Sequence, residues 1–149
     1  IMENTVLPST YMNAKNGILK KRAESEIATE MCRKLRVKTP SYEKIVNQLS
    51  GGNQQKVIIA KWLMMYPKVL ILDEPTRGID VGAKSEIYQI MNELTEQGVS
   101  IIMISSDMEE IMGMADRILV MCEGKISGEL HKGEYTQEKI LEYAAEVKK

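Results

Sequence analysis

The chain has 149 residues, a net charge of −1, 44% hydrophobic residues and 28% charged residues, which is typical of one globular domain that can bury a sizeable core. Because there is no basic excess, nucleic acid is not expected as a partner. No apolar run approaches the roughly 18 residues that a membrane span needs, and no signal peptide is expected.

The first half of the chain reads as helical. It begins at Ile1 rather than at an initiator Met, which suggests a piece of a longer protein or a processed product. An amphipathic helix is predicted from Lys20 to about Arg36, because apolar residues recur at every fourth position among charges. A second, largely buried helix is predicted from Gly51 to about Tyr66, where Pro67 ends it.

The second half alternates strands with helices. The apolar strand at residues 69–72 is expected to be covered on both faces, and residues 100–105, which carry four apolar residues between two serines, are expected to form a second buried strand. A tight turn at Glu123-Gly124 joins two further strands. These elements predict an α/β fold with a mainly parallel sheet that ends in an antiparallel hairpin. The remaining elements are strands at 117–122 and 125–130, and helices at 82–97, 107–115 and 136 to about 147.

A serine and two glycines open the helix that is predicted from Gly51. Ser50 is a good N-cap, and the first amides of a helix lack internal partners and carry partial positive charge. Because Gly51 and Gly52 have no Cβ, a phosphate can approach the backbone. A Ser-Gly-Gly string alone more often marks a plain turn, but the full string over residues 49–56, Leu-Ser-Gly-Gly-Asn-Gln-Gln-Lys, favours a phosphate site.

Two carboxylates, Asp73 and Glu74, follow the first apolar strand, at the edge where α/β sheets bind ligands. An Asp there can hold Mg²⁺ directly or through water, and a Glu beside it can orient and deprotonate an attacking water. Acidic pairs at strand ends are common, but this pair follows the glycine element and favours nucleotide hydrolysis. No stretch of the chain reads G-x-x-x-x-G-K-[ST], the phosphate-cradling P-loop.

These strings resemble those of the ABC (ATP-binding cassette) ATPases. Residues 49–56 are similar to the signature motif of that family, and residues 69–74 to its Walker B strand with the catalytic glutamate. Gly78-Ile79-Asp80 resembles the D-loop, and Ser106 stands where the family has its switch histidine. The resemblance is narrowest to the second cassette of monosaccharide importers with two fused cassettes, the ribose type above all. It covers essentially the whole chain, but only the back part of one cassette.

The resemblance implies a partial P-loop ATPase fold. A helical subdomain is expected over residues 1–67, and the C-terminal part of a RecA-like core over residues 68–149. In the family, two cassettes enclose two ATP molecules head to tail, so a signature motif serves the ATP of the opposite cassette. The expected cofactors are ATP and Mg²⁺, with Asp73 as the metal ligand. The candidate catalytic positions are Glu74 and Ser106, and the candidate nucleotide contacts are Ser50, Gly51, Gly52, Asn53, Gln54, Gln55 and Asp80.

The resemblance also implies a function and partners. The function is ATP-driven import of a monosaccharide, with ribose as the first choice, at the cytoplasmic face of the cell membrane. The partners are the first cassette of the same subunit, membrane permease subunits and, indirectly, a periplasmic or extracellular sugar-binding protein. The isolated chain is expected to be inactive, because it has no phosphate-cradling loop. Two other interpretations stay open: a non-transport ABC ATPase of the repair or translation type, and a purely structural interaction module.

The chain departs from the family pattern in two respects. The Walker A loop and the Q-loop are absent from this sequence. Ser106 cannot replace a protonatable imidazole, and it also reads as an N-cap whose capping box is completed by Glu109. If the Walker A strand normally lies between strands 69–72 and 101–105, these must close a gap, leave open edges or pair with another chain. Self-association or incomplete order near Asp73 is therefore expected.

Overall fold

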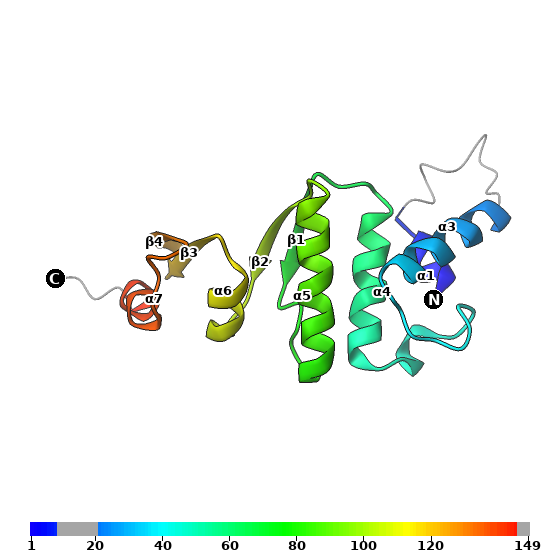
Figure 1. The fold of residues 1–149 in the computed structure, drawn as a ribbon, viewed down its shortest axis with the longest axis horizontal. Helices are drawn as coiled ribbons and strands as arrows, with labels where there is room; N and C mark the ends of the chain where they lie inside the picture. The colour runs from blue at the N-terminus through cyan, green and yellow to red at the C-terminus, as the bar shows by residue number, and fades with distance from the viewer. Residues whose placement is uncertain (9–20, 146–149) are drawn as a thin grey trace. The chain divides into compact units, whose positions relative to one another are not determined.

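The computed structural model describes residues 1–8 and 21–145 of the chain, so the predicted helix start at Lys20 and the end of the last predicted helix, beyond residue 145, lie outside the described residues. The described residues form two compact units, which are divided after Ile104 (Figure 1). This division differs from the predicted boundary after residue 67, because the elements that follow residue 67 pack on the helices before it.

The first unit is built around one central helix, α4 (Gly51–Leu63), which contacts three other α-helices and one 3₁₀ helix (Figure 1). Its apolar side chains Val57, Ile59 and Ala60 are fully buried. The other elements of this unit are α1 (Met2–Val6), α3 (Lys21–Lys34), the short 3₁₀ helix η1 (Val46–Gln48), β1 (Val69–Asp73), α5 (Val81–Glu96) and β2 (Ser100–Ile104).

Helix α4 is shorter and more exposed than predicted. It ends at Leu63, and Tyr66 adopts a left-handed backbone conformation with φ 49°. The reason is Pro67, because a residue before proline is sterically driven out of the helical region. Ile58 and Trp62 are 43% and 50% exposed, so only one face of the helix is buried among the described residues.

Helix α5 follows the sequence closely. The four apolar residues predicted for one helix face lie at the expected spacing, and all four are buried: Ile87, Ile90, Met91 and Leu94. The side chain of Asp80 caps the first turn. Gly98 takes φ 87° just after the last turn, a conformation that favours glycine. The bounds of this helix could therefore be predicted to within a residue.

Strands β1 and β2 pair directly and in parallel, with Val69 opposite Ser100 and Asp73 opposite Ile104. Of the three outcomes expected for these strands, the first is therefore observed: they close the gap. Asp73 is the last residue of β1 and pairs with Ile104, which corrects the expected incomplete order there. The two strands are joined by a single helix, α5, and strands in such a unit commonly lie side by side. The expected burial on both faces is also wrong: Leu70 and Leu72 are buried, whereas the alternate side chains Val69 and Ile71 are 51% and 63% exposed.

The second unit contains α6 (Met108–Met114), β3 (Arg117–Cys122), β4 (Lys125–His131) and α7 (Gln137–Ala144). β3 and β4 form the predicted antiparallel hairpin, and its turn uses positive φ angles at Glu123 and Gly124. This hairpin is a sheet of its own rather than the end of the parallel sheet, which corrects the predicted single sheet. Its core joins four buried side chains: Ile118, Val120, Leu130 and Ile140.

None of the helices formed by residues 1–8 and 21–145 is long and apolar enough to cross a membrane.

Candidate functional site

The first candidate element is the N-terminus of α4. Ser50 takes the extended backbone of an N-cap residue, as predicted, and its carbonyl oxygen accepts the amide of Gln54 at 2.9 Å. Its hydroxyl, however, makes no capping hydrogen bond. Ser50 and Gly51 are both exposed. Because the Ser50 side chain does not accept from the first amides of α4, these amides can bind an anion.

The two glycines of this element are explained by packing. A Cβ on Gly52 would lie 2.4 Å from Ala83 Cβ, and one on Gly51 would lie 3.2 Å from Ile79 Cγ2. The space that Gly52 leaves open is therefore taken up by α5 and not by a ligand. The sequence reasoning predicted close approach to a phosphate, and for Gly52 the structure adds an independent steric reason that the spacing alone did not reveal.

Asn53 connects this helix end to a neighbouring segment of the chain. Its side-chain oxygen accepts the backbone amide of Lys38 at 2.7 Å, and its side-chain nitrogen donates to Ser50 Oγ at 2.8 Å. The next residue, Gln54, donates its side-chain amide to the carbonyl of Leu49 at 2.8 Å. Gln55 is half-buried. The side chains of Asn53 and Gln54 thus hold the first turn of α4 to the segments that contain Lys38 and Leu49.

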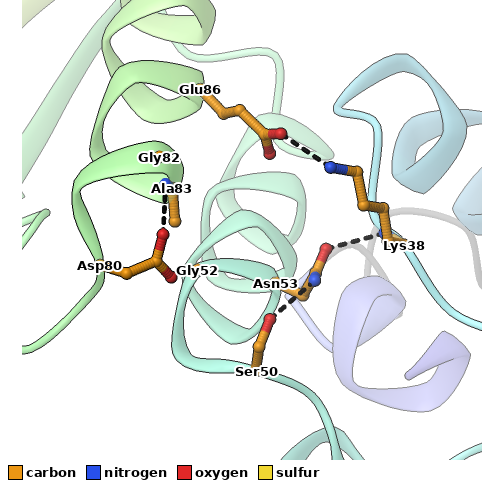
Figure 2. Close-up of a pocket in the computed structure, with 8 residues that line it drawn as sticks. All are labelled: Lys38, Ser50, Gly52, Asn53, Asp80, Gly82, Ala83 and Glu86. Atoms are coloured by element: carbon orange, nitrogen blue, oxygen red, sulfur yellow. Dashed lines mark hydrogen bonds and ion pairs between the residues drawn. The ribbon is translucent and has the colours of Figure 1, made fainter.

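Asp80 begins α5 beside this helix end. Its Oδ1 accepts the amide of Ala83 at 2.9 Å, so its carboxylate caps the helix. Figure 2 shows the pocket between the two helix starts, which has a volume of about 310 Å³. The pocket is lined by Lys38, Ser50, Gly52, Asn53, Asp80, Gly82, Ala83 and Glu86.

Sequence reasoning missed two charged residues of this pocket, Lys38 and Glu86. The Lys38 ammonium donates to Glu86 Oε1 at 2.8 Å, and the ammonium of the buried Lys56 donates to Glu86 Oε2 at 2.5 Å. The hydrogen bonds from Lys38 and then Lys56 lower the pKa of Glu86 to about 2. The hydrogen bond to Glu86 in turn raises the pKa of Lys38. No motif joins Lys38 to Glu86, which are 48 residues apart, so only the fold brings them together.

The second candidate element is the acidic pair after β1. Asp73 is exposed and Glu74 half-buried, and neither lines the pocket at the start of α4. The amide of Glu74 donates to the carbonyl of Ile104 at 2.8 Å, which ties the pair to the end of β2. Glu74 has φ 47°, a left-handed conformation that is costly for a residue with a side chain and is common at functional sites.

The donor set at this strand end suits a hydrated magnesium ion. Within residues 1–8 and 21–145, no group of three His, Cys, Asp or Glu side chains could hold a metal. Magnesium does not require such a group, because it is commonly held by one or two carboxylates together with water and substrate phosphates. Asp73 meets that requirement as an exposed carboxylate at the carboxyl end of a parallel strand.

The predicted capping role of Ser106 is wrong. The N-cap of α6 is Asp107, whose Oδ1 accepts the amide of Glu110 at 3.2 Å. Ser105 Oγ accepts the amide of Asp107 at 3.0 Å and donates to the buried Glu110. The cap is therefore shifted by one residue from the predicted Ser106, because Asp caps a helix as well as Ser does, and the carboxylate three residues on, Glu110, accepts from Ser105. Ser106 itself is exposed and lies in the second unit.

Residues 1–77 match the family described as ABC transporter. The chain is also similar to the ribose import ATP-binding protein RbsA of Bacillus subtilis (strain 168), with 56% identity over 144 residues, covering 97% of this chain and 29% of that protein. The protein of the same name from Clostridium tetani is 59% identical over 134 residues, covering 90% of this chain and 26% of that protein. The chain thus spans less than a third of the length of these curated relatives.

Solved structures show the same fold. The dimeric structure of MJ0796, a bacterial ABC transporter cassette, matches with a TM-score of 0.74 and 25% identity, covering 90% of this chain and 57% of that one. A nucleotide-free ATP-binding cassette from an ABC transporter matches with a TM-score of 0.75 and 25% identity, covering 97% of this chain and 58% of that one. The predicted α/β cassette fold is therefore confirmed.

Proposed function

The chain belongs to the ABC transporter family, and from this we propose that it forms part of the ATP-hydrolysing subunit of a monosaccharide importer. Ribose is the favoured sugar, because the relatives above are named for ribose import. The observation that carries the proposal is the accessible N-terminus of α4, where Ser50, Asn53 and Asp80 line one pocket. A nucleotide-hydrolysing subunit needs such a site for a triphosphate.

We assign the phosphate-binding role to Ser50 and the amides in the first turn of α4. The dipole of α4 favours an anion at this end of the helix. Asp73 and Glu74 lie outside this pocket, so we assign the helix start and the acidic pair to two different nucleotide sites. The start of α4 then acts on ATP held by the first cassette of the same subunit. Glu74 faces a second ATP site, where it orients the attacking water.

Magnesium and ATP are the cofactors of this proposal. Asp73 would hold the magnesium ion. When bound, this ion would neutralise the negative charge that develops on the phosphates during hydrolysis. The site that contains Glu74 is the weaker one, because a seryl hydroxyl at the switch position, Ser106, cannot take up a proton as imidazole does. The helical subdomain over residues 1–67 and the core over residues 68–149 remain the proposed division of the complete cassette.

The partners proposed for the complete subunit are membrane permease subunits, through which a sugar-binding protein acts indirectly. This arrangement places the subunit at the cytoplasmic face of the cell membrane.

Uptake of labelled ribose tests this function. The full-length subunit is returned to cells that lack it, either unchanged or with Ser50→Ala. We expect the unchanged subunit to restore uptake and Ser50→Ala to reduce it strongly, because the loss of one donor to a developing anion costs about a hundredfold to a thousandfold in kcat. Ribose uptake that does not depend on the subunit would contradict the proposed substrate. Normal uptake with Ser50→Ala would contradict the proposed site.

A further inference from the structure

Lys56 is a buried cation that the proposed function does not use. Its side chain is 1% exposed. Its ammonium donates to Glu86 Oε2 on α5 at 2.5 Å and to the carbonyl oxygen of Arg36 at 3.1 Å. Lys56 lies on α4, so one ammonium joins that helix to α5 and to the segment that contains Arg36.

Neutralising Glu86 does not account for Lys56. Glu86 is 37% exposed and already pairs with Lys38 at 2.8 Å. Burying an ammonium costs several kcal/mol of hydration, and an apolar side chain of similar length would fill the same space. What Lys56 adds is its hydrogen bond to the carbonyl of Arg36. Together with the bonds that the amides of Arg36 and Val37 make to the end of α3, it fixes a part of the chain that has no regular secondary structure.

The segment fixed in this way is connected to Ser50 by two hydrogen bonds through the side chain of Asn53. Two residues after Arg36, the amide of Lys38 donates to Asn53 Oδ1 at 2.7 Å. This bond determines which end of the Asn53 amide faces Ser50, because only the oxygen can accept an N–H. The nitrogen therefore donates to Ser50 Oγ, at 2.8 Å (Figure 2).

The orientation of the Asn53 amide determines how the Ser50 hydroxyl group is used. A seryl oxygen can accept hydrogen bonds and has one hydrogen to donate. Because its oxygen accepts from Asn53, its hydrogen points away from Asn53 and is free to face an anion. Ser50 also makes no capping bond that would fix its hydroxyl otherwise.

We infer that Lys56 and Asn53 are positioning residues that, through the backbone of residues 36–38, hold the Ser50 hydroxyl ready to donate to a phosphate. The inference rests on the proposed function, since it concerns the same phosphate site. Asn53 acts here through Ser50, not as a contact of its own to the nucleotide. Lys56 acts less directly, from the buried side of α4. It holds the carbonyl of Arg36, and the segment after Arg36 bonds to Asn53 through the amide of Lys38.

A double-mutant cycle on the full-length subunit tests this. ATP turnover is measured for Asn53→Ala and for Lys56→Met, each made in the unchanged protein and in Ser50→Ala. We expect each variant to lower kcat about threefold to tenfold in the unchanged protein. In the Ser50→Ala background neither should lower it further, because the hydroxyl that they position is gone.

The possible outcomes distinguish a failure of the positioning role from a failure of the proposed phosphate site. If Ser50→Ala leaves turnover unchanged, the proposed phosphate site is wrong. If Ser50→Ala lowers turnover but Asn53→Ala or Lys56→Met lowers it by the same factor in both backgrounds, the positioning role is wrong and the site stands. A direct contact between Asn53 and the nucleotide would give that second result, as would a purely structural role of Lys56.

Two controls accompany the cycle. Glu129→Gln removes an exposed ion pair to Arg117, 3.1 Å long, in the second unit, which shares no residue with the contacts that lead from Lys56 to Ser50, and turnover should not change. Thermal unfolding shows whether each variant folds. If Lys56→Met does not fold, Asn53→Ala still decides the result, because its half-buried side chain lies at the edge of the pocket.

Discussion

At the scale of single residues, the signature string has a steric role beside its proposed role in binding. Gly52 is buried against Ala83, and no other side chain fits between the two backbones as they lie. The sequence pointed to this string through its chemistry, and the proposed contacts of Ser50 still follow from it. It could not show the role of Gly52, because the approach of residue 83 to residue 52 depends on how α4 and α5 cross.

Replacing Gly52 by Ala should destabilise the first unit. The new Cβ would lie 2.4 Å from Ala83 Cβ, and such overpacking costs about 1–3 kcal/mol, more than the gain of up to about 1 kcal/mol in helix propensity. Denaturant unfolding followed by the fluorescence of Trp62, the one tryptophan of the chain, measures the loss. Adding Ala83→Gly should recover part of it beyond simple additivity. Additive effects of the two changes would show that the contact is not limiting.

At the scale of elements, a short polar cluster holds α4, α5 and the segment after α3 together. Lys38, Lys56 and Glu86 come from these three parts of the chain. The sequence predicted α5 almost to the residue, since its apolar spacing, cap and closing glycine agree. It could not predict this cluster, because long-range ion pairs leave no periodic signal. It also misplaced the cap of α6, where three successive residues, 105–107, can all act as caps.

The stabilising effect of Glu86 should depend on pH. Its pKa is lowered from 4.5 to about 2 in the folded chain, so between these values the unfolded chain binds more protons. The contribution is therefore complete above about pH 4.5 and is lost as the pH falls toward 2. The difference in unfolding free energy between the unchanged chain and Glu86→Gln should shrink over that window.

The matched control for this titration is Glu93→Gln, which removes an exposed ion pair on the same helix. Exposed pairs contribute little, so its effect should be small throughout. A difference between Glu86→Gln and the unchanged chain that stays constant from pH 5 to pH 2 would contradict the assigned pairing.

At the scale of the whole molecule, we propose that the chain carries elements of two different nucleotide sites. The start of α4 presents Ser50 in a pocket, while Asp73 and Glu74 stand at the end of β1, outside that pocket. The sequence predicted the α/β class and both elements from local strings. It did not predict the exposed face of β1 and β2, because an apolar strand does not reveal what covers it. Among the described residues the sheet of β1 and β2 has only these two strands, so its outer edges are open and self-association of the chain stays a prediction.

The measurement that bears most directly on this division is ATP turnover by the purified full-length subunit, with Ser50→Ala and Glu74→Gln made separately. Ser50→Ala should reduce turnover strongly, because Ser50 serves the active ATP site of the opposite cassette, whereas Glu74→Gln should reduce it much less. Loss of all turnover with Glu74→Gln, together with normal turnover with Ser50→Ala, would contradict the account.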